Sequence, residues 1–171
     1  MSGQPDLGWY RNLSEGKIMG LYYDDMEVGQ EWVSPGRTVT EWDIMTFATL
    51  TSDMNSIHTD AEYCKTTPFG APIAHGFLIA SLAAGFGARM GIAEGTIVAN
   101  LGISWKFLNP VKAGDTIHLV MSVKEKRPSK SRPGEGIIIR TYDVRNQRGE
   151  TTALGEVAAT FKCKPSLESA A

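Results

Sequence analysis

Residues 77–90 read FLIASLAAGFGARM, and residues 97–107 read IVANLGISWKF. The first stretch is apolar almost all round at helical spacing, which predicts a helix that is buried on most of its sides. Its alanines and glycines would let another element pack very close to it. The second stretch alternates with a period of two, as a strand does. The side chains expected on its apolar face are Ile97, Ala99, Leu101, Ile103, Trp105 and Phe107.

Shorter patterns extend this outline in both directions. Further strands are predicted over residues 31–39, 117–123, 137–144 and 152–162, with turns around Pro128 to Pro133 and over Asn146 to Gly149. A long antiparallel sheet that follows one apolar helix favours an α+β fold in which the sheet wraps around the helix. This arrangement is the hotdog architecture.

The segment between the first strand and the apolar helix is predicted to be helical. Thr40 is a suitable N-cap, and Asp43 lies three residues further on, where an acid suits the helix dipole. Six apolar side chains are expected to crowd one broad face of this first helix: Trp42, Ile44, Met45, Phe47, Ala48 and Leu50. A second, short helix is expected to start at Thr59 or Asp60 and to stop before Pro68.

The composition excludes several classes of protein. The 171 residues include 17 basic and 19 acidic side chains, a net charge of −2, which gives no reason to expect a nucleic-acid or anionic-membrane partner. No apolar run approaches the roughly 20 residues that span a bilayer, and the N-terminus does not resemble a secretory signal. Cys64 and Cys163 are far apart and are expected to be reduced thiols. We expect a cytoplasmic protein with an N-terminal extension over residues 1–20, a single hotdog domain over 21–165 and a disordered tail over 166–171.

The string TSDMNSIHTD, residues 51–60, contains the first candidate for chemistry. Asp53 and His58 are five residues apart across an irregular loop and can point into one cleft. A carboxylate and an imidazole that hold a water between them can pass protons in both directions, as the addition of water to a double bond requires. The alternative is an Asx-turn at Asp53 with His58 merely capping the next helix. The spacing alone leaves both interpretations open.

The second candidate lies directly before the apolar helix, in PIAHGFLIASL, residues 72–82. Gly76 is expected in the first turn of that helix, with a free backbone N–H and no side chain in a ligand's way. Such amides stabilise negative charge, so this turn is a candidate oxyanion hole for a thioester enolate. His75 is expected to fix the turn rather than act as an acid or base, and His118, the third histidine, is expected to be structural or exposed.

These motifs resemble the signature of the MaoC-like dehydratases, the (R)-specific enoyl-CoA hydratase branch of the hotdog superfamily. That pattern is an aromatic residue, then D-x-N-P-x-H-x-D, then A-H-G after a spacer, and a later F-x-x-P-V-x-x-G-D. The matching positions here are Phe47, Asp53, Asn55, His58, Asp60, Ala74, His75, Gly76, Phe107, Pro110, Val111, Gly114 and Asp115. The resemblance covers about residues 21 to 163.

The resemblance implies a hydro-lyase that converts an enoyl-CoA to an (R)-3-hydroxyacyl-CoA. Asp53 and His58 would be the catalytic dyad, the Gly76 amide would polarise the thioester carbonyl, and Asn55 and His75 would support them, with no metal and no cofactor. The sequence departs from the pattern in Ser52 for a glycine, Ser56 for a proline and Ala84 for a serine of some members. The last difference indicates a differently shaped acyl pocket.

Two alternatives to a hydratase are a hotdog acyl-CoA thioesterase and a non-catalytic acyl-thioester binding module. The Asp–His pairing disfavours both. The expected partners are an acyl-CoA or acyl-carrier thioester and at least a second copy of the chain. A basic stretch is expected to be either a solvated hairpin tip or a contact for CoA phosphates; it contains Lys124, Lys126, Arg127, Lys130 and Arg132.

Overall fold

A computed structural model describes residues 20–165 of the chain. The expected N-terminal extension, up to residue 19, and the expected tail from residue 166 lie outside these described residues. Within residues 20–165, no helix combines the length and the apolar character needed to cross a membrane.

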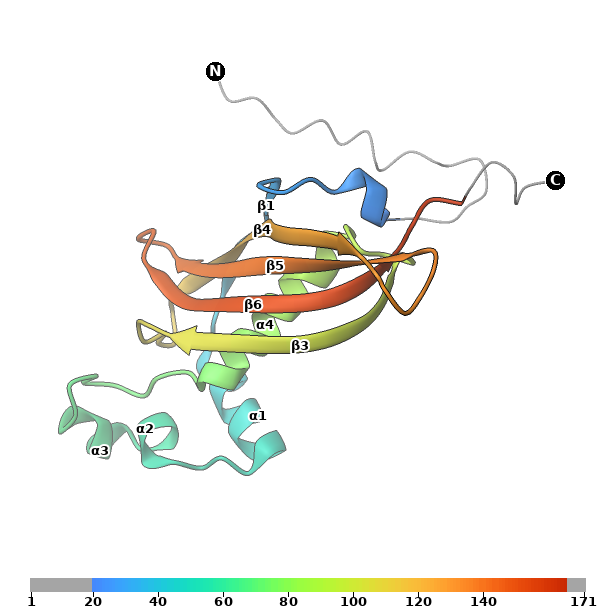
Figure 1. Ribbon diagram of the computed structural model, residues 1–171. Coiled ribbons are helices and arrows are strands. Elements are labelled where there is room, and N and C mark those ends of the chain that lie inside the picture. The colour runs from blue at the N-terminus through green and yellow to red at the C-terminus, as the bar shows by residue number, and fades with distance from the viewer. Residues whose placement is uncertain (1–19, 166–171) are drawn as a thin grey trace, which may run out of the picture.

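One antiparallel sheet forms the body of the domain (Figure 1). Its strand order is β1-β4-β5-β6-β3, with bounds of Glu31–Val33 for β1, Thr116–Pro128 for β4, Glu135–Asn146 for β5, Thr151–Lys162 for β6 and Ile97–Phe107 for β3. The strand expected over residues 31–39 is divided in two, and β2 (Arg37–Thr38) pairs separately with β4. Pro35 lies in the break, where it has no N–H to offer a strand ladder.

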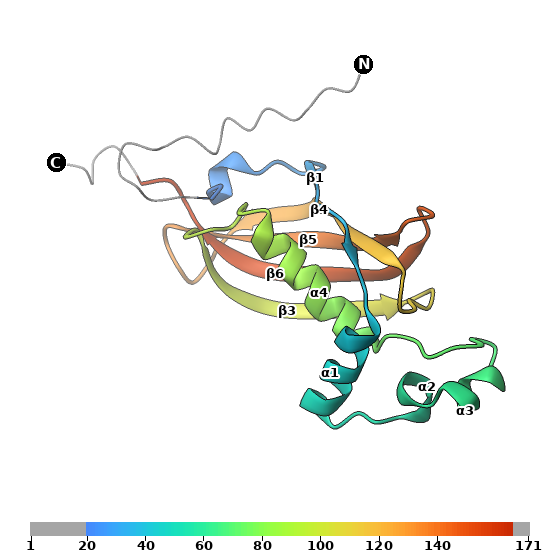
Figure 2. The ribbon, with the colours of Figure 1, turned by 180° about the vertical axis from the view of Figure 1, so that it is seen from behind.

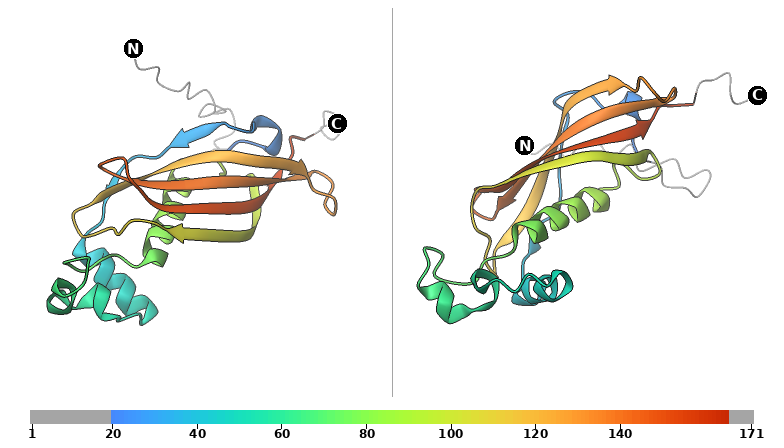
Figure 3. Two further views of the ribbon diagram at one scale, coloured as in Figure 1. Left: turned by 60° about the vertical axis from the view of Figure 1, so that its left-hand side comes forward. Right: turned by 60° about the horizontal axis from the view of Figure 1, so that its bottom comes forward.

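The apolar helix α4, Gly76–Arg89, crosses one face of the sheet, and the sheet curves around it (Figures 2 and 3). Leu78, Ile79, Ala83 and Phe86 are buried against the core. The hotdog arrangement expected from the sequence is therefore confirmed. The expectation of burial on most sides is wrong for the single chain, because Phe77, Ser81, Ala84 and Ala88 form an exposed face.

The remaining α-helices lie beyond one end of the sheet (Figure 2). They are α1 (Glu41–Thr51), α2 (Ser56–Thr59) and α3 (Ala61–Lys65), and a 3-10 helix, Tyr23–Asp25, lies apart from them. The short helix expected to start at Thr59 or Asp60 is α3, which Asp60 caps through its bond to the Tyr63 amide, 2.9 Å. Helix α2, which directly precedes it, is not among the helices expected from the sequence. On α1 only Ile44 and Ala48 of the six expected apolar side chains are buried, while Trp42 and Leu50 are 73% and 80% exposed.

Strand β3 departs from the simple alternation expected for it. Two irregularities, between Ile97 and Ala99 and between Asn100 and Gly102, shift its register against β6. Asn100 consequently shares a cavity wall with Ile97, Ile103 and Trp105, and Ala99 and Leu101 do not line that cavity. Bulges of this kind re-aim side chains and are frequent near functional sites.

Candidate active site

The loop after α1 presents Asp53. Helix α1 ends at Ser52, whose φ of +62° places it in the left-handed region that favours glycine. Asp53 follows with an exposed side chain, and its carboxylate accepts a bond from the Asn55 amide at 3.4 Å. This bond is the Asx-turn considered above, and it coexists with the proximity of Asp53 to His58 described below.

His58 lies in α2 and is 9% exposed. The helix begins after Asn55, whose side chain accepts a bond from the Ile57 amide at 3.3 Å. The His58 Nδ1 lies 2.7 Å from the Ile73 carbonyl oxygen. A carbonyl can only accept, so Nδ1 carries a proton here, and in the corresponding tautomer of the imidazole Nε2 is the acceptor.

His75 is the residue before α4 and is 2% exposed. Its Nε2 donates to the backbone carbonyl of Asp53 at 2.9 Å, and its ring stacks on His58 with centroids 3.7 Å apart. The buried Nδ1 has no hydrogen-bond partner among residues 20–165. His75 therefore connects the start of α4 to the Asp53 loop.

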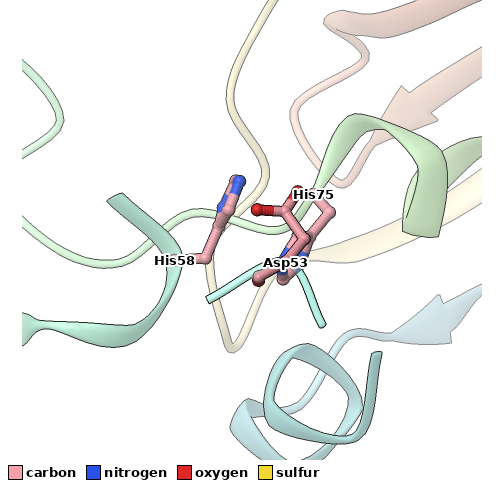
Figure 4. Close-up of side chains that lie close together, drawn as sticks. All are labelled: Asp53, His58 and His75. Atoms are coloured by element: carbon pink, nitrogen blue, oxygen red, sulfur yellow. The ribbon is translucent and has the colours of Figure 1, made fainter. Parts of the chain in front are cut away.

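Figure 4 shows the three side chains together. Each of Asp53, His58 and His75 offers one nitrogen or oxygen atom within 4.8 Å of the others. The same atoms could in principle be offered to a metal ion. However, the histidine planes are stacked at only 27°, so their lone pairs lie in separate, nearly parallel planes, a poor geometry for one ion. The arrangement is better suited to proton transfer.

Gly76 is the first residue of α4, as expected. No hydrogen bond from its N–H occurs within the described part of the chain, so this amide is available to an anion. Packing adds a requirement for glycine that was not expected from the sequence. A Cβ at residue 76 would lie 2.8 Å from the Phe107 ring.

A cleft of about 410 Å³ opens at this point, and we call it the helix-end cleft. Its walls include His58, Gly76, Phe107 and Asn109. A second hollow of about 440 Å³, the helix-side cavity, lies between α4 and the sheet and was not foreseen from the sequence. Phe77 lines the helix-side cavity and contacts Phe107 of the helix-end cleft edge-on, with centroids 6.1 Å apart, so each hollow has one ring of this aromatic pair in its wall.

The basic stretch forms the end of the β4–β5 hairpin. Lys124 pairs with Glu156 at 2.6 Å, Arg132 pairs with Glu135 at 3.6 Å, and Lys126 binds the Met26 carbonyl at 2.6 Å and covers the Tyr23 ring. Along β5, Gly136 at the hairpin end is eight residues from Val144. Val144 pairs with Ala153 of β6, and Ala153 lines the helix-end cleft. At 3.3 Å per residue the hairpin is about 26 Å from that cleft in one chain. His118 is partly exposed on β4 and does not line either hollow.

A sheet wrapped around one helix, with an aspartate and histidines at the N-terminal end of that helix, defines a hotdog protein with a polar site suited to proton transfer. Residues 25–143 match the family described as the MaoC like domain. The chain belongs to this family of MaoC-like dehydratases.

Three comparisons place the chain within the family. The (R)-specific enoyl-CoA hydratase of Rhodospirillum rubrum is 37% identical over 119 residues, which are 69% of this chain and 80% of that protein. Protein MaoC of Klebsiella aerogenes is 33% identical over 115 residues, 67% of this chain, and the chain spans about a third (34%) of that longer relative. The crystal structure of the MaoC-like dehydratase from Rhodospirillum rubrum has a TM-score of 0.79 at 28% identity and covers 86% of this chain and 100% of that one.

Proposed function

We propose that the protein reversibly hydrates an enoyl thioester, taking an enoyl-CoA to the (R)-3-hydroxyacyl-CoA. The observation that supports this most strongly is the proximity of Asp53 and His58 beside the unbonded N–H of Gly76. The relative from Rhodospirillum rubrum is named for the same reaction. Asn55 and His75 support the dyad through the hydrogen bonds described above.

In this mechanism a water lies between the Asp53 carboxylate and the His58 Nε2. Its oxygen bonds to the β-carbon of the enoyl group while one of its O–H bonds breaks and gives that proton to the dyad. The electrons of the double bond move towards the thioester carbonyl, and the Gly76 amide stabilises the negative charge that develops there. The dyad then returns a proton to the α-carbon. Because the two groups are coupled, the roles of acid and base belong to the pair.

A single assay distinguishes this function from the two alternatives. Incubation with crotonyl-CoA should remove the enoyl absorbance without releasing free thiol. Thiol release at a rate equal to the loss of absorbance would instead indicate a thioesterase. Binding of crotonyl-CoA without any reaction would indicate a binding module.

The proposed assembly is at least a homodimer through β3. This strand forms one edge of the sheet over eleven residues and exposes Val98, Leu101 and Ile103. Unpaired edges of this length invite pairing with another chain. If two β3 strands pair in antiparallel fashion, the Ile97 end of one strand lies beside the Phe107 end of the other. The partner's basic hairpin, which is at its Ile97 end, then lies at the end of this chain's sheet that holds Asp53. The proposed CoA-phosphate role of Lys130 and Arg132 is therefore a role across the dimer.

A further inference from the structure

Arg140 is the unexpected member of an apolar row. On β5 the side chains of Ile138, Arg140, Tyr142 and Val144 alternate inward towards α4 and are all buried. Arg140 is 5% exposed. Arginine is seldom buried to this extent unless it is paired with an anion.

No anion among the described residues forms an ion pair with the Arg140 guanidinium, and this includes Glu94, which lines the helix-side cavity. None of the ion pairs among residues 20–165 includes Arg140, and its buried Nε has no hydrogen-bond partner. The rings of Tyr142 and Phe161 lie 5.5 and 5.2 Å from its central carbon. Such stacking stabilises the charge through the faces of the group but leaves the Nε–H, which lies in the plane of the group, without an acceptor.

The guanidinium is nonetheless charged. Burial lowers the pKa of Arg140, and the neighbouring Tyr142 hydroxyl partly opposes this effect. An arginine remains protonated in proteins because its ordinary pKa is so high. The interior of the domain therefore holds a desolvated positive charge.

Arg140 forms part of the wall of the helix-side cavity. On the helix side, Ala80, Ala84 and Gly87 are too small to fill the space. On the sheet side, Tyr142 and Asn100 line the same cavity, and their side chains carry further potential donors. A planar fork of N–H groups beside additional donors is well suited to a carboxylate.

The pairing register locates this charge relative to the proposed reaction site. Phe107, against which Gly76 packs, is in register with Ala153 and Val144. Arg140 is in register with Val157 and Ile103, four residues deeper along the strands. At 3.3 Å per residue, the two levels are about 13 Å apart. The Arg140 side chain and an acyl chain of a few carbons can together span that distance.

We infer that Arg140 binds the far carboxylate of a dicarboxylic acyl thioester, so that the substrate class of this enzyme is the 2-enoyl thioesters that end in a carboxylate. This inference rests on the proposed function for the reaction at the other end of the substrate. It also gives a role to the space beside Ala84, where some family members have a serine.

Equilibrium binding tests this assignment independently of turnover. Glutaryl-, adipyl- and suberyl-CoA are each compared by isothermal titration calorimetry with the neutral ester of equal carbon number: pentanoyl-, hexanoyl- and octanoyl-CoA. At one or more of these lengths the dicarboxylic ester should bind at least about tenfold more tightly, the scale of a hydrogen bond to a charged group. Equal or tighter binding of the neutral esters at all three lengths would overturn the inference.

Two variants assign the preference to the residue. Arg140→Met should abolish the preference for the dicarboxylic ester. This variant should fold, because replacing a buried charge by an apolar side chain of similar volume is often neutral or stabilising. Arg145→Met is the matched control on the same strand; its guanidinium pairs with Asp143 on the other face and the preference should remain. If the methionine variant does not fold, Arg140→Lys replaces it, and the preference should fall because lysine lacks the planar fork. A preference that survives unchanged in the folded Arg140 variant contradicts the inference.

The binding and hydration measurements together distinguish a failure of the Arg140 inference from a failure of the proposed function. A carboxylate preference without hydration of any enoyl ester would support the Arg140 subsite and contradict the hydratase. Hydration without the preference would do the reverse.

Discussion

Gly76 and Gly85 are two glycines of the same helix with opposite surroundings. A Cβ at residue 76 would lie 2.8 Å from the Phe107 ring, whereas nothing lies within 4 Å of a Cβ at residue 85. We expect Gly76→Ala to lower the free energy of unfolding by about 1 kcal/mol or more through overpacking. Gly85→Ala should raise it by roughly 0.5–1 kcal/mol, because alanine is the better helix former. Urea denaturation measures both values, and similar changes in the two variants would contradict the packing described here.

At the scale of residues, the sequence predicts which groups gather but not how they are held. The spacing of Asp53, His58 and His75 in their motifs is sufficient to nominate them. The bond from His75 to the Asp53 carbonyl joins residues 22 positions apart and depends on where α4 meets the loop. Arg140 does have a signal in the sequence, because it is in phase with three apolar residues of a predicted strand: Ile138, Tyr142 and Val144.

At the scale of elements, the start of α1 is fixed by a capping box, and the end of this helix positions Asp53. The Thr40 hydroxyl accepts from the Asp43 amide at 3.2 Å, and the Asp43 carboxylate accepts from the Thr40 amide at 2.8 Å. Thr40→Ala should therefore lower the free energy of unfolding by about 1 kcal/mol. Thr49→Ala, in the exposed middle of the same helix, should change it by less than about 0.5 kcal/mol. Equal effects in thermal or urea denaturation would contradict this role of the cap.

The capping box of Thr40 and Asp43 also predicts that the free energy of unfolding depends on pH. Burial would by itself raise the pKa of Asp43, but the hydrogen bonds from Thr40 and the charge of Arg37 bring it below its ordinary value of 3.8. A carboxyl whose pKa is lower in the folded state stabilises the fold above the unfolded-state pKa, and this stabilisation is lost as the pH falls through the folded-state value.

The measurement is the difference in unfolding free energy between the wild type and Asp43→Asn from pH 7 to pH 3. We expect a constant difference above about pH 5 that shrinks as the pH falls below 3.8. Other carboxyl groups titrate equally in both proteins and cancel. A difference that does not vary with pH would show that the Asp43 charge does not contribute.

The periodic elements were predictable and the irregular ones were not. The patterns of α4 and β3 each run for more than ten residues, so the position of both was apparent. Helix α2 was not apparent, because its four residues are too few to show a helical period. The shifts of register in β3 depend on its pairing with β6, and they decide that Asn100 rather than Leu101 faces the helix-side cavity.

At the scale of the whole molecule, the proposed dimer depends on the β3 edge. Light scattering at micromolar concentration should give at least twice the 18.6 kDa of one chain. Leu101→Lys, at a residue that is 55% exposed on β3, should shift the mass towards that of one chain, because a charged side chain on an edge opposes pairing. Val33→Lys, on β1 with 63% exposure, is the matched control and should leave the mass unchanged. A wild-type mass of one chain would contradict the proposed assembly.

The central claim is that the Asp53–His58 pair transfers protons during hydration. It is tested most directly by the turnover of Asp53→Asn and His58→Ala with crotonyl-CoA, followed by the enoyl absorbance beside His118→Ala, a histidine that lines neither hollow. Each dyad variant should lose at least about a hundredfold in turnover, the scale of a positioned acid or base, while it keeps the circular dichroism of the wild type. The His118 variant should keep its turnover. A folded Asp53 or His58 variant that hydrates crotonyl-CoA at near the wild-type rate would contradict the account.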